Sequence, residues 1–187
     1  DATPFTTLIA CLLSLRTRDE VTAERAEALF ELASTPEDLV RLNVKTIEKT
    51  IKPVGFYRRK ARTVKNVAKT IIEEYGGNVP DTVEELVKMK GVGRKTANLV
   101  VAVAYNKPAI CVDTHVHRVM NRLGYVRTKE PDHTEAALRE KLPRAHWIGI
   151  NRVLIRFGRN VCTPISPRCS TCPVLKYCDQ VGVEKHR

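Results

Sequence analysis

The chain has 187 residues, of which 43% are hydrophobic, so it is long enough to bury a core and too apolar to be disordered. Lysine and arginine number 32 against 21 acidic residues, and the formal net charge of +11 favours a polyanionic partner such as nucleic acid. The sequence shows no signal peptide and no apolar run of the ~18 residues that a membrane span needs, so we expect an intracellular protein without a membrane partner.

Helical patterns follow one another along the first half of the chain. Apolar spacing and flanking breakers predict helices over residues 5–15, 17–32, 36–42, 44–51, 61–75 and 83–89. The expected N-caps are Thr3, Thr17, Thr35 and Thr82. Thr17 is followed three residues later by Glu20 and Thr82 by Glu85, the spacing of a capping box.

The second half is also helical until its tail. Apolar faces over residues 97–104 and 112–123 predict two helices, and two more are predicted near residues 135–142 and 145–157. The segment from Cys162 onward is rich in proline and cysteine and is expected to be irregular. No alternating strand pattern extends beyond a few residues, so the predicted class is all-α.

A tight turn joins two of these helices. Gly91 and Gly93 would leave backbone N–H groups uncovered at the start of the next helix, which suits the binding of a phosphate. Val92 lies between the glycines, and Lys90 and Arg94 flank them. The alternative is a tight connection with no ligand, but the basic chain favours the phosphate. Such a contact would position DNA without specifying bases.

Two residues near this turn could carry chemistry. Lys95 would lie in the first turn of a helix, where the dipole opposes positive charge and so favours a nucleophilic amine; a lysine that only pairs with phosphate is the alternative. Asp113 precedes another helix and is most simply an N-cap, but a capped carboxylate can also act as a base or stabilise an oxocarbenium ion. Together they could displace a base from deoxyribose, form a Schiff base and cleave the strand by β-elimination.

Four cysteines in the tail form the most specific motif. The pattern is Cys162-x6-Cys169-x2-Cys172-x5-Cys178. Such a set indicates either a tetrahedral zinc ion or an iron–sulfur cluster, and the presence of only one close Cys-x2-Cys pair favours iron–sulfur. Disulfides are the weakest alternative in an intracellular chain.

Four further residues are candidates of lower specificity. Arg16 and Phe56 could be wedges that fill the gap left by an extruded base, although an exposed loop arginine and a core phenylalanine are the simpler interpretations. Asp19 could be a helix cap or an acceptor in a base pocket. His115 is a second base-pocket candidate, with a helix-surface position as the alternative.

From about Phe5 to Cys178, the chain resembles endonuclease III, of the helix–hairpin–helix DNA glycosylase superfamily. The resemblance rests on Gly-Val-Gly-Arg-Lys-Thr-Ala at 91–97, on Val-Asp-Thr-His at 112–115 and on the four-cysteine spacing. The interval between the lysine and the aspartate also matches.

This resemblance implies two helical domains on either side of a DNA-binding cleft. Residues 1–107 would form a six-helix barrel, with the helix–hairpin–helix at about 81–105. Residues 108–187 would form a smaller domain with a [4Fe–4S] cluster loop at 162–178.

It also implies a function and roles for particular residues. The protein would be a glycosylase and abasic-site lyase that excises oxidised or ring-saturated pyrimidines flipped out of duplex DNA. Lys95 matches the Schiff-base lysine and Asp113 the essential aspartate of the family. The cluster ligands would be Cys162, Cys169, Cys172 and Cys178. We further expect a monomer in the cytoplasm of a prokaryote, associated with the nucleoid.

Several positions depart from the family pattern. Bacterial members typically have glutamine where Arg16 stands and leucine where Phe56 stands, both positions that fill the gap. Lys90 replaces a usual proline and adds charge beside the hairpin. In the loop between the first two cysteines, Arg168 is the one cation expected to contact DNA. Branches of the superfamily that only excise bases lack the lysine, so Lys95 argues against a purely monofunctional enzyme. The rival hypothesis of a different class is a DNA-binding module without catalysis, which would use the hairpin and the cluster only for shape.

Overall fold

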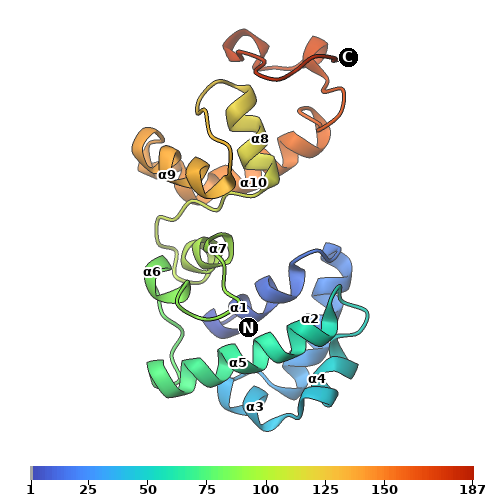
Figure 1. The fold of residues 1–187 in the computed structure, drawn as a ribbon, viewed down its shortest axis with the longest axis vertical. Helices are drawn as coiled ribbons and strands as arrows, with labels where there is room; N and C mark the ends of the chain where they lie inside the picture. The colour runs from blue at the N-terminus through green and yellow to red at the C-terminus, as the bar shows by residue number, and fades with distance from the viewer. Residues whose placement is uncertain (1) are drawn as a thin grey trace. The chain divides into compact units, whose positions relative to one another are not determined.

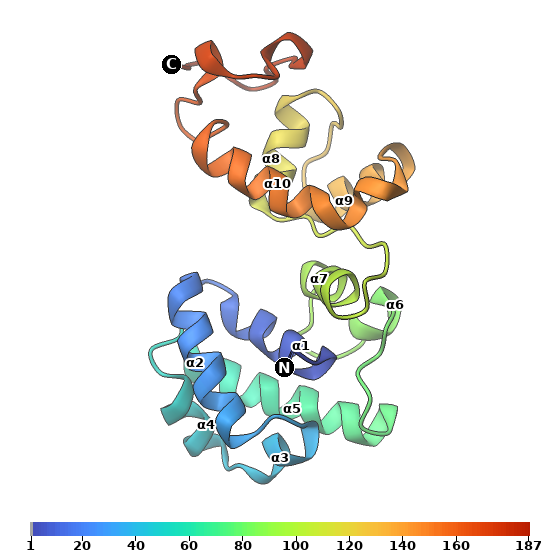
Figure 2. The same cartoon turned by 180° about the vertical axis from the view of Figure 1, so that it is seen from behind.

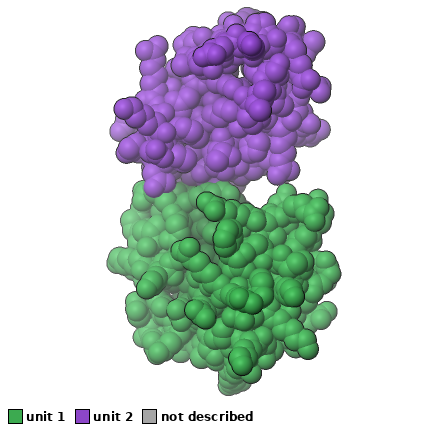
Figure 3. Space-filling model, turned by 45° about the vertical axis from the view of Figure 1, so that its right-hand side comes forward, with its two compact units in different colours: residues 1–106 green, residues 107–187 purple. Residues whose placement is uncertain are grey.

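Residues 2–187, described by a computed structural model, form an all-helical structure (Figure 1). No β-strand occurs within that range, which confirms the predicted all-α class. The helices gather into two compact units, residues 1–106 and residues 107–187, coloured separately in Figure 3. No helix in the described part of the chain is long and apolar enough to cross a membrane.

The first unit is built around one long helix, α5 (Tyr57–Tyr75). α5 contacts α1, α3 and α4, and α1 also contacts α2 and α7 (Figures 1 and 2). The buried face of α5 includes most of the predicted apolar stripe, namely Ala61, Val64, Val67, Ala68 and Ile71. The other helices of this unit are α1 (Pro4–Ser14), α2 (Asp19–Leu32), α3 (Pro36–Arg41), α4 (Val44–Ile51), α6 (Val83–Leu86) and α7 (Arg94–Ala104).

Threonine caps begin three of these helices, as predicted. Thr3, Thr35 and Thr82 each accept a hydrogen bond from the backbone N–H three residues later. The Glu85 carboxylate, expected to close a capping box with Thr82, instead accepts hydrogen bonds from the Tyr75 hydroxyl and the Lys88 amine. The caps are local signals, so they could be recognised from the sequence.

The predicted cap at Thr17 is wrong. Arg18 is the N-cap of α2, and no side chain caps that helix. The Thr17 hydroxyl instead accepts hydrogen bonds from the N–H of Gly55 at 3.2 Å and from the amine of Lys60 at 3.1 Å. The hydroxyl predicted to cap α2 therefore accepts hydrogen bonds from residues that lie far away in the sequence.

The second unit packs three helices around an apolar core. α8 (Thr114–Arg122) contacts both α9 (Pro131–Lys141) and α10 (Trp147–Asn160). The fully or nearly buried core residues include Val116, Val119, Met120, Leu138 and Leu154. A 3₁₀ turn, η1 (Arg144–His146), precedes α10. After α10 the chain is irregular except for two 3₁₀ turns, η2 (Cys169–Thr171) and η3 (Leu175–Tyr177), which agrees with the prediction for this tail.

Two predicted helix ends in this unit are wrong. α9 begins at Pro131 rather than near residue 135, because proline is favoured at the first helical position, where no N–H donor is needed. α10 continues to Asn160 rather than ending near residue 157, and the Asn160 side chain donates to the carbonyl of Arg156 in its last turn.

Candidate functional site

The two-glycine hairpin joins α6 to α7 in the first unit. α6 ends at Leu86, three residues earlier than predicted, and turns carry the chain to Gly91, where φ is +99°. A Cβ atom at position 91 would lie 2.6 Å from Cγ2 of Thr63 in α5. Only glycine therefore allows the hairpin to contact α5 this closely.

The start of α7 is accessible to an anion. Gly93 is its N-cap, no side chain caps this end, and nothing lies within 4 Å of the place where a Cβ atom of Gly93 would be. Val92 is buried and holds the turn, whereas Lys90 and Gly91 are exposed. A helix N-terminus beside an exposed ammonium is a favourable place for a phosphate.

Lys95 is the second residue of α7, and its side chain is exposed. The next two residues, Thr96 and Ala97, are buried, and α7 contacts α1. Cys11 of α1 lies within electrostatic range of Lys95: burial raises the pKa of the Cys11 thiol to about 11, and the Lys95 charge acts in the opposite direction. Helix packing thus sets the position of the exposed amine.

Asp113 is the N-cap of α8 in the second unit, as predicted. Its Oδ1 accepts hydrogen bonds from the N–H groups of His115 and Val116, both at 2.9 Å. Both bonds fall on the same oxygen, so the cap does not use Oδ2. The residues on either side of this turn, Val112 and Val116, are buried, which fixes the carboxylate in place.

Arg16 and Phe56 lie side by side although 40 positions separate them in the sequence. Both adopt left-handed backbone conformations, with φ of 55° and 57°. The Arg16 guanidinium lies 5.7 Å from the centroid of the Phe56 ring, a cation–π distance. Phe56 is 62% exposed. The structure therefore joins the two gap-filling candidates in one exposed pair.

Lys60 holds together the two loops that carry this pair. Its buried amine donates to the carbonyl of Leu13 at 2.7 Å, to the carbonyl of Leu15 and to the Thr17 hydroxyl. The same hydroxyl accepts from the N–H of Gly55, next to Phe56. Sequence reasoning missed Lys60, and its position at the start of the apolar stripe of α5 was the available signal.

The four cysteines of the tail line one hollow in the second unit. They are Cys162, Cys169, Cys172 and Cys178, all free thiols. The other walls of this hollow are largely apolar. The structure thus brings the predicted ligand set together.

The surroundings of the thiols suit an iron–sulfur cluster. Arg122 Nη1 donates to Cys162 Sγ at 3.5 Å, and the N–H of Gln180 donates to Cys178 Sγ at 3.4 Å. Burial raises the pKa of the Cys178 thiol; the Gln180 N–H opposes this effect, and the nearby cysteines add a smaller increase. Within residues 2–187, no three potential ligands are gathered closely enough to hold a single metal ion. Thiolate ligands with N–H donors to sulfur in an apolar pocket are characteristic of iron–sulfur sites.

The remaining candidates occupy separate places. Asp19 is exposed at the first position of α2. His115 lies in the second unit with its Nδ1 3.1 Å from Arg118 Nη2, and burial lowers the pKa of His115. Arg168 is exposed and immediately precedes η2. The base-pocket roles of Asp19 and His115 and the DNA contact of Arg168 stay predictions.

The chain is similar to several curated and solved proteins. It is 46% identical to endonuclease III of Thermotoga maritima over 94% of this chain and 83% of that protein, and 44% identical to endonuclease III of Bacillus subtilis over 94% and 80%. It is 45% identical to a chloroplastic endonuclease III homolog of Arabidopsis thaliana, of which it spans about half, 47%. A trapped endonuclease III–DNA covalent intermediate superposes with a TM-score of 0.89 and 40% identity, over 96% of this chain and 85% of that one.

The fold and the site define a base excision DNA repair protein. The profile of the HhH-GPD superfamily base excision DNA repair proteins matches residues 9–144, and that of the iron–sulfur binding domain of endonuclease III matches residues 162–178. With the identities above, the chain belongs to the endonuclease III family. It is accordingly a DNA glycosylase with abasic-site lyase activity and a [4Fe–4S] cluster, which decides against zinc.

Proposed function

We propose that Lys95 is the nucleophile and Asp113 its acid–base partner in the excision of damaged bases from duplex DNA. One observation carries the proposal: the Lys95 amine is exposed in the first turn of α7, directly after a hairpin that is accessible to phosphate. The solved relative trapped as a covalent intermediate with DNA supports a covalent route.

In the first step, the Lys95 amine attacks C1′ of the damaged nucleotide. The bond from C1′ to the base breaks, and its electron pair leaves with the base, which takes up a proton. Asp113 accepts a proton from the amine and stabilises the positive charge that develops on the sugar. The N–H bonds to Oδ1 keep this carboxylate oriented, and Oδ2 would be the oxygen that accepts the proton.

In the second step, the sugar ring opens as the amine forms an imine with C1′. The imine makes the C2′ proton acidic, and a base removes it. The bond from C3′ to its phosphate oxygen then breaks with the electron pair leaving on the phosphate, so the strand is cleaved by β-elimination. Water hydrolyses the imine and returns Lys95.

We assign the substrates to oxidised or ring-saturated pyrimidines, which stack and pair poorly and so cost less to extrude. The exposed pair Arg16 and Phe56 would fill the gap left by the extruded base. The residues from Lys90 to Arg94 would grip a backbone phosphate without reading sequence.

The [4Fe–4S] cluster would be held by the four thiolates that line the hollow in the second unit. When bound, the cluster supplies a cross-link that holds the C-terminal tail in shape. Arg122 orients this tail through its bonds to Cys162 Sγ and to the carbonyl of Thr163, the latter at 2.7 Å. We place the protein in the cytoplasm of a prokaryote, on nucleoid DNA, as a monomer.

Borohydride trapping tests the assignment of Lys95. Incubation with an abasic duplex and borohydride should reduce the imine and give a protein–DNA adduct, with the modification at Lys95 by peptide mass spectrometry. Lys95→Ala should give no adduct while retaining DNA binding. An adduct at another lysine, or binding by the wild type without any adduct, would remove Lys95 from this role.

A further inference from the structure

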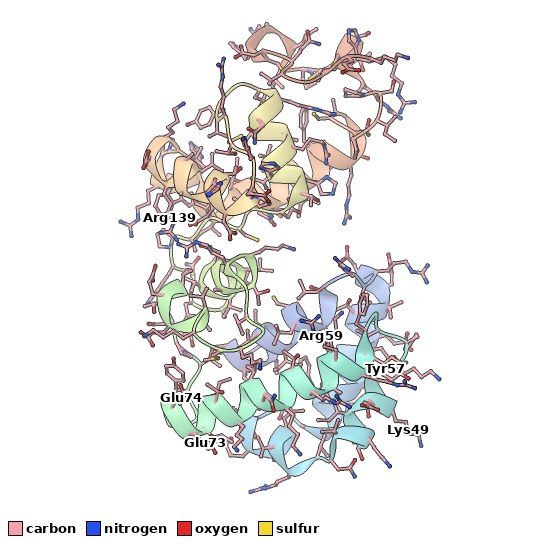
Figure 4. All side chains as sticks on the ribbon, in the orientation of Figure 1. Lys49, Tyr57, Arg59, Glu73, Glu74 and Arg139 are labelled. Carbon is pink, nitrogen blue, oxygen red and sulfur yellow. The ribbon has the colours of Figure 1, made fainter. Side chains whose placement is uncertain are left out.

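The charges along α5 run against its helix dipole. Arg58 and Arg59 lie in its first turn and Arg62 in its second, whereas Glu73 and Glu74 lie in its last turn. Figure 4 labels Arg59, Glu73 and Glu74 along this helix. The first turn contains no acidic residue and the last turn no basic one. Cations near a helix N-terminus and anions near its C-terminus are both unfavourable, so packing alone does not account for this order.

The basic end of α5 has no acidic partner in the described part of the chain. Among residues 2–187, no carboxylate pairs with Arg58, Arg59, Arg62 or Lys90, and all four are exposed. Arg58 and Arg62 are four residues apart on one helix face, a spacing at which like charges repel. Lys60 differs from these residues, because its amine is buried against backbone carbonyls.

These cations line a groove beside the hairpin. Its walls are Arg58, Arg59, Arg62, Thr63, Asn66, Lys90 and Gly91. A second hollow, which contains Arg16 and Phe56, shares Arg59, Thr63 and Gly91 with it. One side of α5 is therefore hollowed from the Arg16–Phe56 pair to the hairpin, and the close contact of Gly91 with Thr63 fixes the two ends relative to each other.

We propose that this groove, the α5 groove, binds backbone phosphates of duplex DNA near the lesion, in addition to the phosphate gripped by the hairpin. The inference extends the proposed function, since it assumes that DNA lies on the hairpin and on the Arg16–Phe56 pair. Arginine suits the role because its planar guanidinium makes two parallel hydrogen bonds to a phosphate. A bound phosphate would relieve both the repulsion between the arginines and their conflict with the helix dipole.

Salt dependence of binding separates this role from a general effect of positive charge. The variants are Arg62→Gln and the double variant Arg58→Gln/Arg62→Gln, and the control is Lys69→Gln. Lys69 lies on the same helix but pairs with Glu73 at 3.5 Å, and Lys69→Gln changes the net charge as much as Arg62→Gln does. The probe is a duplex with a tetrahydrofuran abasic analogue, which the enzyme cannot cleave.

Each lost phosphate contact should reduce the slope of log Kd against log salt by about one. We expect a reduction of about one for Arg62→Gln and about two for the double variant, with weaker binding at low salt. The control should keep the wild-type slope. Unfolding midpoints without DNA should not fall below the wild-type value, which shows that the variants are folded. A variant slope equal to that of the control would overturn the proposal.

Replacement of single phosphates in the DNA by uncharged methylphosphonates locates the phosphate that Arg62 contacts. Single methylphosphonates are placed in turn along each strand near the lesion, and their effect on Kd is measured for the wild type and for Arg62→Gln. At the contacted linkage the two changes should be non-additive, because each removes the same interaction. Additivity at every linkage would contradict the α5 groove. Trapping at Lys95 by the wild type does not depend on Arg62, so the proposed function would stand in that case.

Discussion

The guanidinium of Arg16 lies 5.7 Å from the ring centroid of Phe56, and both residues have left-handed backbone conformations. The pair is exposed, yet its two loops are tied to each other through Lys60 and Thr17. Such a pair can fill a gap between stacked bases. The aromatic ring offers a flat face for stacking, and the guanidinium beside it carries a positive charge that is attracted to DNA.

Shortening the aromatic side chain should weaken lesion processing. Loss of the ring in Phe56→Ala removes stacking worth about 1–3 kcal/mol, so kcat/KM on a lesion duplex should fall about 5- to 150-fold. The kcat/KM of Phe56→Leu should lie between that of Phe56→Ala and that of the wild type. Stability should change little, since Phe56 is 62% exposed. Single-turnover excision measures the effect, and an unchanged kcat/KM for Phe56→Ala would exclude the wedge role.

A methyl group at position 55 should disturb the same pair. A Cβ atom at Gly55 would lie 2.6 Å from the carbonyl oxygen of Arg16, and this overpacking should cost about 1–3 kcal/mol in the free energy of unfolding. Gly149→Ala is the matched control, because nothing lies within 4 Å of its Cβ position in α10. The control should gain about 0.5–1 kcal/mol. Urea unfolding compares the two, and equal shifts would contradict the contact.

Replacement of the buried lysine should change the pH dependence of stability. Burial lowers the pKa of Lys60 from 10.5 to about 8. Between these values the unfolded chain binds the proton more tightly, so the stability of the wild type should rise with pH relative to Lys60→Met. Below about pH 8 this contribution should be constant.

Lys60→Met should also leave carbonyls of Leu13 and Leu15 without their donor, at a cost of about 1–3 kcal/mol. Urea unfolding between about pH 7 and about pH 10 gives both quantities. Arg16 and Arg59 line the same hollow as Lys60. A parallel pH dependence in the two proteins would show that Lys60 does not titrate there.

Three substitutions at Asp113 should separate its cap from its chemistry. Asp113→Asn and Asp113→Ser keep an oxygen that can accept from the N–H groups of His115 and Val116, so stability should change by less than about 0.5 kcal/mol. Asp113→Ala should cost about 1 kcal/mol. All three should lower the rate of excision about 100-fold or more, because each removes the carboxylate. Substantial activity in the stable variants would leave Asp113 as a cap only.

Removal of one thiolate should release the tail. Cys178→Ser should lower the iron content and the visible absorbance, whereas Cys11→Ser, outside the hollow, should retain both. Hydrogen exchange should then accelerate over residues 162–187, with helices of residues 1–106 still protected. Full iron content in Cys178→Ser would exclude it as a ligand.

Features that depend on near neighbours in the chain could be predicted from the sequence. Three of the four threonine caps are confirmed, and the apolar stripe of α5 lies on its buried face. The cysteine spacing predicted a common site for the same reason, because all four thiols lie in one short segment, and they line one hollow.

Features that depend on distant partners could not be predicted. Thr17 has the local signature of a cap, but Lys60 and Gly55 take its hydroxyl. The pairing of Arg16 with Phe56 requires two loops to meet, and no periodicity encodes that. The arginines at the start of α5 were also missed as a group, because the predicted helix began at residue 61 and left Arg58 and Arg59 outside it, whereas α5 begins at Tyr57.

The contact between Gly91 and Thr63 holds the hairpin against α5, so on binding the DNA rather than the protein would change shape. The hairpin, the arginines and the Arg16–Phe56 pair all pack against the single helix α5. Their spacing is therefore set before DNA binds. A duplex bound to these residues as proposed would have to kink and open, and the work of doing so is smallest where stacking is already weak. The protein would thus select a damaged site first by how easily the DNA bends there, before it contacts any atom of the base.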